Sequence, residues 1–364
     1  MRLDVRFAAW IALLLAGRAL GADIVGTLPV DPVALAQGTE LPGDEALSAE
    51  HYRFRYLFAS EENRARFLKA PQRYEIQLGG GCGRMGPLSG VGRPDLFAAY
   101  DGQIYIFASE ACRKTFLAQP HRLIESDDPQ PSVLPGAVHK GRALLERAIA
   151  AMGGAERLDA VRSVRQQRVR QVEQDGKQVE AADALTILFP DRVRLEKRWD
   201  DWSWSAVSTG ERGWFEQEDE RWEMHAQQRR ALTRHHLNRN LLTILRARTA
   251  PGFLVYDAGE GSVATGAGDT KVERVGVVFD RCAATLGLDP DSGRVVSLTC
   301  RSRGPAMFFG ERTLVFSDFR AVEGLWLPHA ETLYFEGKQT EGEPSVYEVL
   351  INPSNAEEAF KAKD

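Results

Sequence analysis

The sequence predicts an α+β protein in two parts: a small duplicated α+β module, followed by a large, curled antiparallel sheet with a few helices. The stretch YLFASEENRARFLKAPQRY (Tyr56–Tyr74) recurs as YIFASEACRKTFLAQPHRL (Tyr105–Leu123). A segment dense in Pro and Asp, ESDDPQPSVLPGA (Glu125–Ala137), follows the second copy. After it, strand-like runs such as RVRLEKRW and KVERVGVVFD follow one another with Asp/Gly turns between them, which is typical of an antiparallel meander.

Residues 1–22 predict a secretory signal peptide. MRLDVR is a short basic start, FAAWIALLLAG is an apolar run, and RALGAD offers small residues for cleavage after Gly21 or Ala22. The run is shorter than the ~20 residues that span a bilayer, and no later stretch is long and apolar enough. We therefore expect a periplasmic or secreted protein that does not span the membrane after cleavage; a retained N-terminal anchor helix is the alternative.

The charge of the chain argues against nucleic acid as a partner. The 364 residues carry a formal net charge of −5, spread without a strong block, and so lack a basic footprint for phosphates. This length is enough for two domains with a core each.

Each copy of the repeat predicts a strand that runs through a cap into a short helix. Aromatic residues alternate along the first strand, at the period of a half-buried strand: Tyr52, Phe54, Tyr56 and Phe58. Ser60 is then placed to cap a helix that Pro71 ends, and Ser109 and Pro120 repeat this in the second copy. Units this short cannot bury their aromatic faces alone, so the two should pack into one domain.

The Pro- and Asp-rich segment predicts the domain boundary, because such a composition cannot bury a core. We expect the repeated module at 23–124 (copies at about 52–74 and 101–123), a linker at 125–138 and the sheet domain at 139–364. A helix in GRALLERAIAAMGG should precede the strands, and QQRRALTRHHLNRNLLTILRAR should interrupt them. A single sheet of about ten strands must curl, and its concave face must be covered or must bind something.

The N-terminal module resembles the YHS family, whose small units are related to TRASH-type heavy-metal modules. The matching stretches are DPVAL (Asp31–Leu35), GGGCGRM (Gly79–Met85) and YDGQIYIFASEACRKTFLAQP (Tyr100–Pro120). The aromatic and Pro framework is kept, but the thiols are depleted. Cys82 and Cys112 match two family cysteines, whereas Ala108 replaces another, and in the first copy the corresponding places hold Ala34, Ala59 and Asn63.

This resemblance implies a soft metal ion, copper or zinc, with Cys82 and Cys112 as ligands. Such a site usually needs three or four ligands, so His121 or Met85 would have to supply another. In an oxidising compartment we favour a disulfide between Cys82 and Cys112, with free thiols as a further alternative. Neither the disulfide nor the free thiols would require a cofactor.

The other two cysteines predict a structural disulfide between Cys282 and Cys300. Cys282 precedes AATLGLD, and Cys300 ends RVVSLTC. If Asp289–Gly293 forms a five-residue hairpin loop, the two cysteines fall opposite each other, close enough for a bridge.

The C-terminal part resembles the LolA-like periplasmic carrier family, whose members fold as an antiparallel half-barrel with helices in its mouth. The resemblance rests on the helix that ends at Gly153–Gly154, on ERGWFEQ, on LDPDSGRVVSL, and on the ending FSDFRAVEGLWLPHAETLYF with VLINPSNAEEAF. It implies a concave apolar surface that accepts a lipid or acyl chain. We expect four tryptophans to be candidates for lining it, with core packing as the alternative: Trp202, Trp204, Trp214 and Trp222.

No motif supports catalysis, since the sequence has no Gly-x-Ser-x-Gly elbow, His-Glu-x-x-His pair, phosphate loop or dinucleotide fingerprint. His235 and His236 point to different faces of the expected helix, which indicates solvated positions and not a chelate. We therefore expect a non-enzymatic, exported binding protein for a hydrophobic small molecule or lipid. The alternatives are heavy-metal handling through the N-terminal module, and an envelope module that docks a partner protein.

Overall fold

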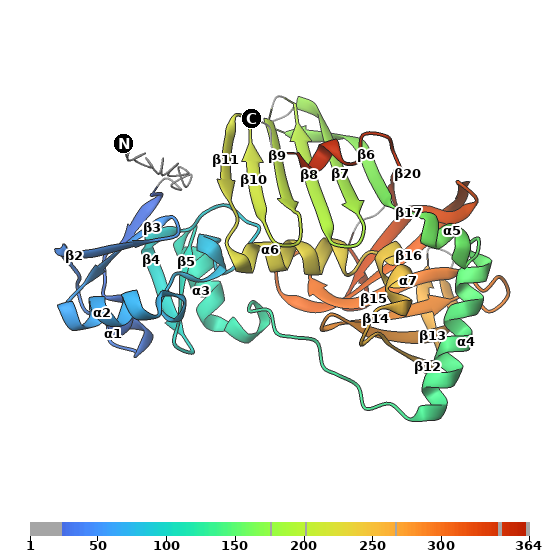
Figure 1. Ribbon diagram of the computed structural model, residues 1–364, viewed down its shortest axis with the longest axis horizontal. Coiled ribbons are helices and arrows are strands. Elements are labelled where there is room, and N and C mark those ends of the chain that lie inside the picture. Colours follow the sequence, from blue (N-terminus) through green and yellow to red (C-terminus); the bar gives the residue numbers. More distant parts are fainter. Residues whose placement is uncertain (1–23, 175–176, 201, 266–267, 341–343, 362–364) are drawn as a thin grey trace, which may run out of the picture.

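The computed structural model of the chain describes residues 24–174, 177–200, 202–265, 268–340 and 344–361. The predicted signal peptide, residues 1–22, lies outside these ranges. Figure 1 shows a small N-terminal module beside a larger C-terminal part, in which helices lie between two groups of strands. Among the described residues, no helix is both long enough and apolar enough to cross a membrane.

The N-terminal module contains both copies of the repeat. Its elements are, in chain order, β1 (Gly26–Leu28), α1 (Pro32–Ala36), β2 (Asp44–His51), β3 (Phe54–Phe58), α2 (Glu61–Lys69), β4 (Arg93–Tyr100), β5 (Gln103–Phe107) and α3 (Glu110–Ala118). Each copy is an antiparallel strand pair followed by a helix, and β1 adds to the first copy in parallel. Ser60 and Ser109 cap α2 and α3 as the sequence predicted.

One phenylalanine of each helix packs into the strands of its own copy. Phe67 of α2 lies with its ring centroid 4.7 Å from that of Tyr56, and Phe116 of α3 repeats the same 4.7 Å contact with Tyr105. Both phenylalanines are buried. Burial of a side chain of this size contributes about 1.5–3 kcal/mol, so these aromatic cores hold the two short units together.

The C-terminal part opens with helices α4 (Pro135–Ala151) and α5 (Ala155–Ala160). The first sheet contains β6 (Ser163–Gln174), β7 (Lys177–Leu188), β8 (Arg192–Trp199), β9 (Trp202–Ser208), β10 (Gly213–Gln217), β11 (Glu220–Glu223) and β20 (Glu348–Ile351). Helices α6 (Ala226–Leu232) and α7 (Leu241–Arg246) follow. The second sheet contains β12 (Leu254–Thr265), β13 (Gly268–Phe279), β14 (Cys282–Leu288), β15 (Val295–Arg303), β16 (Phe309–Val322), β17 (Leu325–Phe335), β18 (Lys338–Gln339) and β19 (Ser345–Val346).

The prediction of one continuous sheet is wrong, although both sheets are antiparallel. In the described residues the strand order is β11-β10-β9-β8-β7-β6-β20 in one sheet and β12-β13-β14-β15-β16-β17-β18 in the other. Both β11 and β12 are edge strands, and the helical segment from α6 to α7 separates them along the chain. That segment lies between the sheets (Figure 1), so its apolar side chains form a shared core with the inner faces of both.

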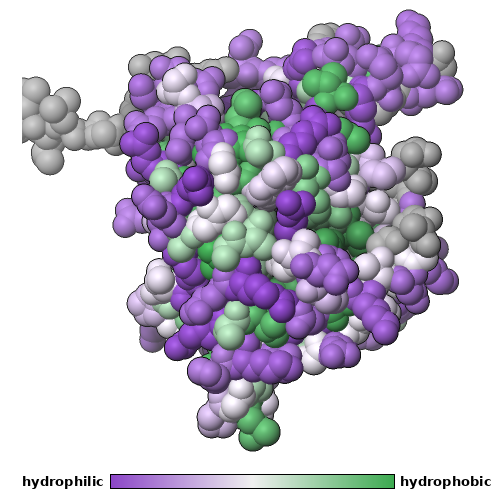
Figure 2. Space-filling view, turned by 90° about the vertical axis from the view of Figure 1, so that its right-hand side faces the viewer, coloured by the Kyte–Doolittle hydropathy of each residue, from purple (hydrophilic) through white to green (hydrophobic). Residues whose placement is uncertain are grey.

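The segment that the sequence predicted as a linker is anchored in the C-terminal part. Asp128 has only 4% of its surface exposed. Its carboxylate lies 3.1 Å from Nη2 of Arg234 and 3.3 Å from Nη2 of Arg239. Composition alone did not indicate this, because the charges are buried through pairing and not through apolar contact. Beyond this anchor the chain leads into α4, and Figure 2 shows that side of the molecule with hydrophilic residues around hydrophobic ones gathered toward the middle.

Candidate functional site

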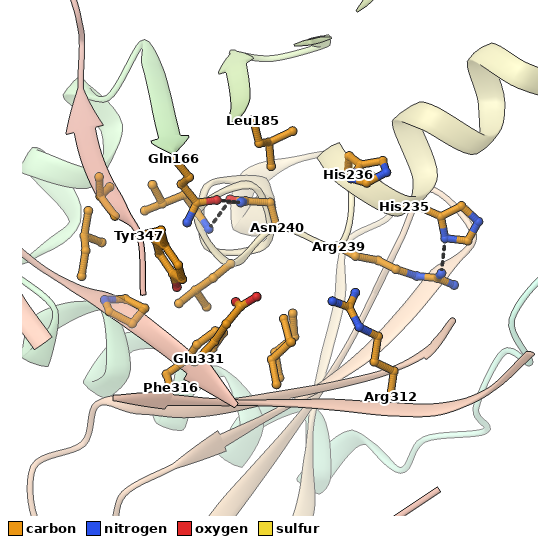
Figure 3. Close-up of a pocket in the computed structure, with 17 residues that line it drawn as sticks. Gln166, Leu185, His235, His236, Arg239, Asn240, Arg312, Phe316, Glu331 and Tyr347 are labelled. Carbon is orange, nitrogen blue, oxygen red and sulfur yellow. Dashed lines mark hydrogen bonds between the residues drawn. The ribbon is translucent and has the colours of Figure 1, made fainter. Parts of the chain in front are cut away.

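A cavity of about 190 Å³ lies between the two sheets of the C-terminal part (Figure 3). Its apolar lining comes from β7, α7, β15, β16, β17 and β20: Leu185, Leu241, Leu242, Leu298, Leu314, Phe316, Leu327, Pro328 and Val349. Its polar lining consists of Gln166, His235, His236, Arg239, Asn240, Arg312, Glu331 and Tyr347. We call this space the inter-sheet cavity. Its lining combines hydrocarbon with a few convergent polar groups, which is typical of small-molecule sites.

The helical segment between the sheets is held at the wall of the cavity by Asn240. The Asn240 side-chain oxygen accepts a hydrogen bond from the Leu242 backbone N–H at 3.0 Å and so caps α7. Its amide nitrogen donates to Gln166 Oε1 on β6 at 3.1 Å. One side chain therefore caps α7 and ties it to the first sheet, and this fixes the position of the preceding residues that line the cavity.

The basic residues of the cavity, His235, Arg239 and Arg312, lie on one side of it (Figure 3). Arg239 lies 2.8 Å from His235 Nδ1 through its Nη1, and it also pairs with Asp128. His235 Nε2 in turn lies 3.3 Å from Glu125 Oε2. Acidic residues of the 125–128 segment thus already pair with two of the three groups, His235 and Arg239.

Arg312 is the exception on this side. It lies half-buried on β16, and its guanidinium makes no hydrogen bond or ion pair within the part of the chain that the structure describes. Arg312, Leu314 and Phe316 all line the cavity at alternating positions of one strand. A guanidinium beside two apolar side chains is well placed to receive an anionic group.

The prediction that His235 and His236 are solvated is wrong. Both line the cavity, because the segment that carries them lies between two sheets and not on the surface. Burial, together with the charges of neighbouring basic groups, lowers the pKa of His236 to about 3, so its ring is neutral at physiological pH. Burial also lowers the pKa of His235, although the carboxylate of Glu125 opposes that effect.

Glu331 and Tyr347 lie on the opposite side of the cavity (Figure 3). Burial, with a further contribution from the Glu331 carboxylate, raises the pKa of the Tyr347 hydroxyl, which therefore stays protonated. A bound molecule thus meets a positive group at one side and hydroxyl and carboxylate groups at the other.

None of the four tryptophans predicted as lining candidates is among the described residues that line the inter-sheet cavity. Trp204 and Trp222 lie on either side of Phe215, with ring centroids 5.8 and 5.6 Å from it, and they pack against the core. Trp202 packs on Trp199 at 4.9 Å. Trp214 is buried in a separate cluster with Phe360 and Val207. Core packing, the alternative stated above, describes Trp204, Trp214 and Trp222.

All four cysteines are buried free thiols in the structure, so it contains neither predicted disulfide. The proposed alignment of Cys282 with Cys300 is wrong, because Ala284 is the residue opposite Cys300. The register shifts between Gly287 and Leu288, so strand positions cannot be counted evenly back from the turn. Cys82 and Cys112 belong to one buried cluster of the N-terminal module.

The predicted metal site stays a prediction. No group of three or more His, Cys, Asp or Glu side chains suited to a metal ion occurs among the described residues. Of the proposed additional ligands, Met85 is 41% exposed and His121 lies in the turn Pro120–Arg122.

Arg312, Glu331 and Tyr347 line the cavity without having been predicted from the sequence. For Arg312 a signal existed, because RTLVF places Arg312, Leu314 and Phe316 at alternating positions of one strand. An arginine on the apolar face of a strand is rare unless its guanidinium binds a partner. No comparable local pattern marked Glu331 or Tyr347, which reach the cavity from β17 and from the chain just before β20.

No protein-family model and no curated protein matches the chain. Its fold is similar to solved structures, with low identity. A DUF1329 family protein from Desulfovibrio piger is 10% identical over 61% of this chain and 97% of its own, with a TM-score of 0.38. A LolA superfamily protein from Nitrosomonas europaea is 11% identical over 57% and 90% of the two chains, with a TM-score of 0.34.

A domain from Vibrio parahaemolyticus, assigned to outer membrane lipoprotein sorting, is 9% identical over 59% of this chain and 92% of its own, with a TM-score of 0.33. The YHS resemblance of the N-terminal module stays a prediction. At TM-scores this low, the function has to be argued from the side chains of this chain.

Proposed function

We propose that the chain is an exported, non-enzymatic binding protein whose inter-sheet cavity holds an acyl chain with an anionic headgroup. The observation that carries this proposal is Arg312, whose guanidinium lacks a partner within the described residues and lies beside apolar cavity walls. A carboxylate or phosphate there would form charge-assisted hydrogen bonds, while its hydrocarbon tail would contact the leucines and Phe316.

The size of the cavity restricts the ligand. A volume of about 190 Å³ accommodates roughly a dozen to twenty water-sized groups, at about 10–15 Å³ for each. One medium-length acyl chain fits this space, whereas a lipid with two or three long chains does not. The proposed ligand is therefore a single-chain amphiphile.

The two halves of such a ligand contribute differently to binding. Each methylene that leaves water stabilises the complex by about 0.8 kcal/mol, so two more methylenes should strengthen binding roughly tenfold until the cavity is full. The charged contact adds about 1.5–3 kcal/mol, and this part depends on the headgroup. Chain length thus sets affinity, and Arg312 sets headgroup selectivity.

Calorimetric titration with ligands of equal chain length tests this proposal: decanoate, decanol and decyltrimethylammonium. We expect decanoate to bind most tightly and the cationic ligand most weakly. In R312Q, decanoate binding should weaken about 10- to 100-fold, while decanol binding stays within about threefold.

The matched control is R320Q, since Arg320 lies on the same strand, is 58% exposed and pairs with Asp318. It should bind decanoate as the unmodified chain does. Equal affinity for decanoate and decyltrimethylammonium, or no binding of any of the three, would contradict the proposal. Native mass spectrometry of exported protein would then identify whether a different molecule co-purifies.

A further inference from the structure

A second cavity, of about 250 Å³, lies on the other face of the second sheet. Leu298 of β15 and Leu314 of β16 line the inter-sheet cavity. Their chain neighbours Ser297, Thr299 and Thr313 line the second cavity. Because successive side chains of a strand point to opposite faces, the two cavities are separated by the strands themselves. We call the second space the hydroxyl cavity.

The end of the β12–β13 hairpin forms a wall of the hydroxyl cavity. The pairing of these strands shifts between Asp257 and Glu260, and such a bulge bends a strand and increases its twist. Beyond it, Ser262 and Ala264 of β12 line the cavity together with Tyr334 of β17. Four other strands separate β12 from β17 in the sheet order, so the sheet curls around this space.

A glycine on the floor of the cavity makes room for a hydroxyl. Gly287 of β14 lies directly opposite Ser297 of β15. A Cβ at Gly287 would overlap the hydroxyl oxygen of Ser297. The absence of a side chain at position 287 therefore lets the Ser297 hydroxyl lie across the neighbouring strand.

Hydroxyl groups from five strands converge on the cavity, and they belong to Ser262, Thr285, Ser297, Thr299, Thr313 and Tyr334. The Thr299 and Thr313 hydroxyl oxygens share a hydrogen bond of 2.9 Å. The Tyr334 hydroxyl donates to Gln339 Oε1 at 3.5 Å. The side chains of the other three make no hydrogen bond within the part of the chain that the structure describes.

Ser297 is the most informative of these residues. It is 1% exposed, and its hydroxyl lines the cavity without a partner in the described ranges. Buried polar groups nearly always have a hydrogen-bond partner, because leaving one unpaired costs its desolvation. A polar molecule in the cavity would supply the missing partner.

The lining indicates which kind of molecule this is. The two charged residues of the lining, Arg274 and Glu311, are opposite in sign, and both are exposed. Neither forms an ion pair within the described residues. The interior groups are hydroxyls, which both donate and accept hydrogen bonds. An anion would meet Glu311, and an apolar molecule would leave the hydroxyls unpaired, so the lining favours a neutral molecule with several hydroxyls.

The volume is consistent with a single sugar ring. At about 10–15 Å³ for each water-sized group, the cavity accommodates roughly 17–25 such groups. A monosaccharide of about a dozen non-hydrogen atoms fits this space with a few bridging waters.

We infer that the hydroxyl cavity binds a neutral polyol of the size of a monosaccharide. The Ser297 and Thr285 hydroxyls bond to hydroxyls of the ligand, and Arg274 and Glu311 contact it from the solvent side. This inference does not depend on what occupies the inter-sheet cavity, because the two cavities lie on opposite faces of the sheet.

The first test is saturation-transfer NMR on the full-length chain with glucose, galactose, mannose and myo-inositol. We expect at least one of the four to bind with a millimolar or lower dissociation constant. Glycerol should bind at least about tenfold more weakly than that ligand, because it pairs with fewer of the hydroxyls. Absence of binding by all four at concentrations up to about 50 mM would overturn the inference.

The second test compares S297A and T285V with the unmodified chain. Each variant should weaken binding of that polyol about three- to tenfold. Neither should lower stability to urea, since each removes a hydroxyl that has no partner in the described chain. The control is S317A, an exposed serine on β16 that is not among the described residues lining the cavity. Unchanged affinity in both S297A and T285V would mean that the cavity holds water alone.

Discussion

His225, in the C-terminal part, donates a hydrogen bond from Nε2 to the buried carboxylate of Glu75 in the N-terminal module, over 3.2 Å. The Gln227 backbone N–H donates to His225 Nδ1 at 3.3 Å, so the ring proton has to be on Nε2. His51 contacts the same carboxylate oxygen from within the module at 2.8 Å. One carboxylate therefore links the two parts of the chain.

Acid should weaken the structure through Glu75. Burial would raise the pKa of the Glu75 carboxyl. The hydrogen bonds and charges of His225 and His51 outweigh this effect and lower the pKa to about 2. A folded-state pKa below the unfolded one gives stability that is present above about pH 4.5 and is lost as the pH falls toward 2. The full contribution is about 3 kcal/mol, at 1.36 kcal/mol for each pH unit.

Urea unfolding of E75Q at several pH values measures this contribution. At pH 7 we expect the variant to lose about 1–3 kcal/mol, and its stability should change less than that of the unmodified chain between about pH 4.5 and 2. The control is E50Q, an exposed glutamate on β2. A variant that follows the pH dependence of the unmodified chain would argue against Glu75 as its source.

Removal of the Asp128 carboxylate should be costly. It pairs with Arg234 and Arg239, and it accepts the Ala283 backbone N–H at 3.0 Å. In D128A two buried guanidinium groups lose a counter-ion, which destabilises a fold by about 3–5 kcal/mol. Thermal unfolding should show a clear drop for D128A and almost none for D127A, because the side chain of Asp127 is 61% exposed. Similar melting temperatures in both variants would mean that the 125–128 segment is not anchored as described.

The duplicated aromatic cores should be equivalent in energy. Phe67 and Phe116 are both fully buried, so F67A and F116A should each cost about 3–5 kcal/mol. The next residue of each helix is a natural control: Leu68 is 54% and Leu117 is 48% exposed, and truncation to Ala there should cost less than about 0.5 kcal/mol. Chemical denaturation of all four variants would reveal whether one copy supports the module more than the other.

What the sequence could predict was local. The Ser60 and Ser109 caps and the strand aromatics Phe54, Tyr56 and Phe58 depend on residues close in the chain, and these predictions are confirmed. The prediction is wrong for Tyr52, which lies in the turn before β3. The division into two sheets depends on which edge strands meet after the helical segment, and no local pattern records that. The alignment of Cys282 and Cys300 failed by two positions: the turn pairs Leu288 with Val295, one residue later than expected, and the irregularity next to that pair adds one more.

The candidate site was harder to predict than the fold. Its polar residues come from segments far apart in the sequence, and each is unremarkable next to its chain neighbours. The local sequence predicts that His235 and His236 are solvated, because their helical segment contains both polar and apolar residues. Both line the cavity, because the segment lies between two sheets. Only Arg312 breaks its local pattern, since it alternates with Leu314 and Phe316 on a buried face.

Phe316 should limit the chain length that the inter-sheet cavity accepts. Its ring lines the cavity and is 7% exposed, so F316A should enlarge the space by several methylene-sized groups. We expect the preferred fatty acid in calorimetric titration to become longer by two to four carbons (about one carbon for each methylene-sized group), together with a loss of about 3–5 kcal/mol in stability. The control is F319A, a phenylalanine on the same strand that packs against the core without being among the described residues that line the cavity. Should F316A and F319A both keep the original chain-length preference, the acyl chain does not occupy this space.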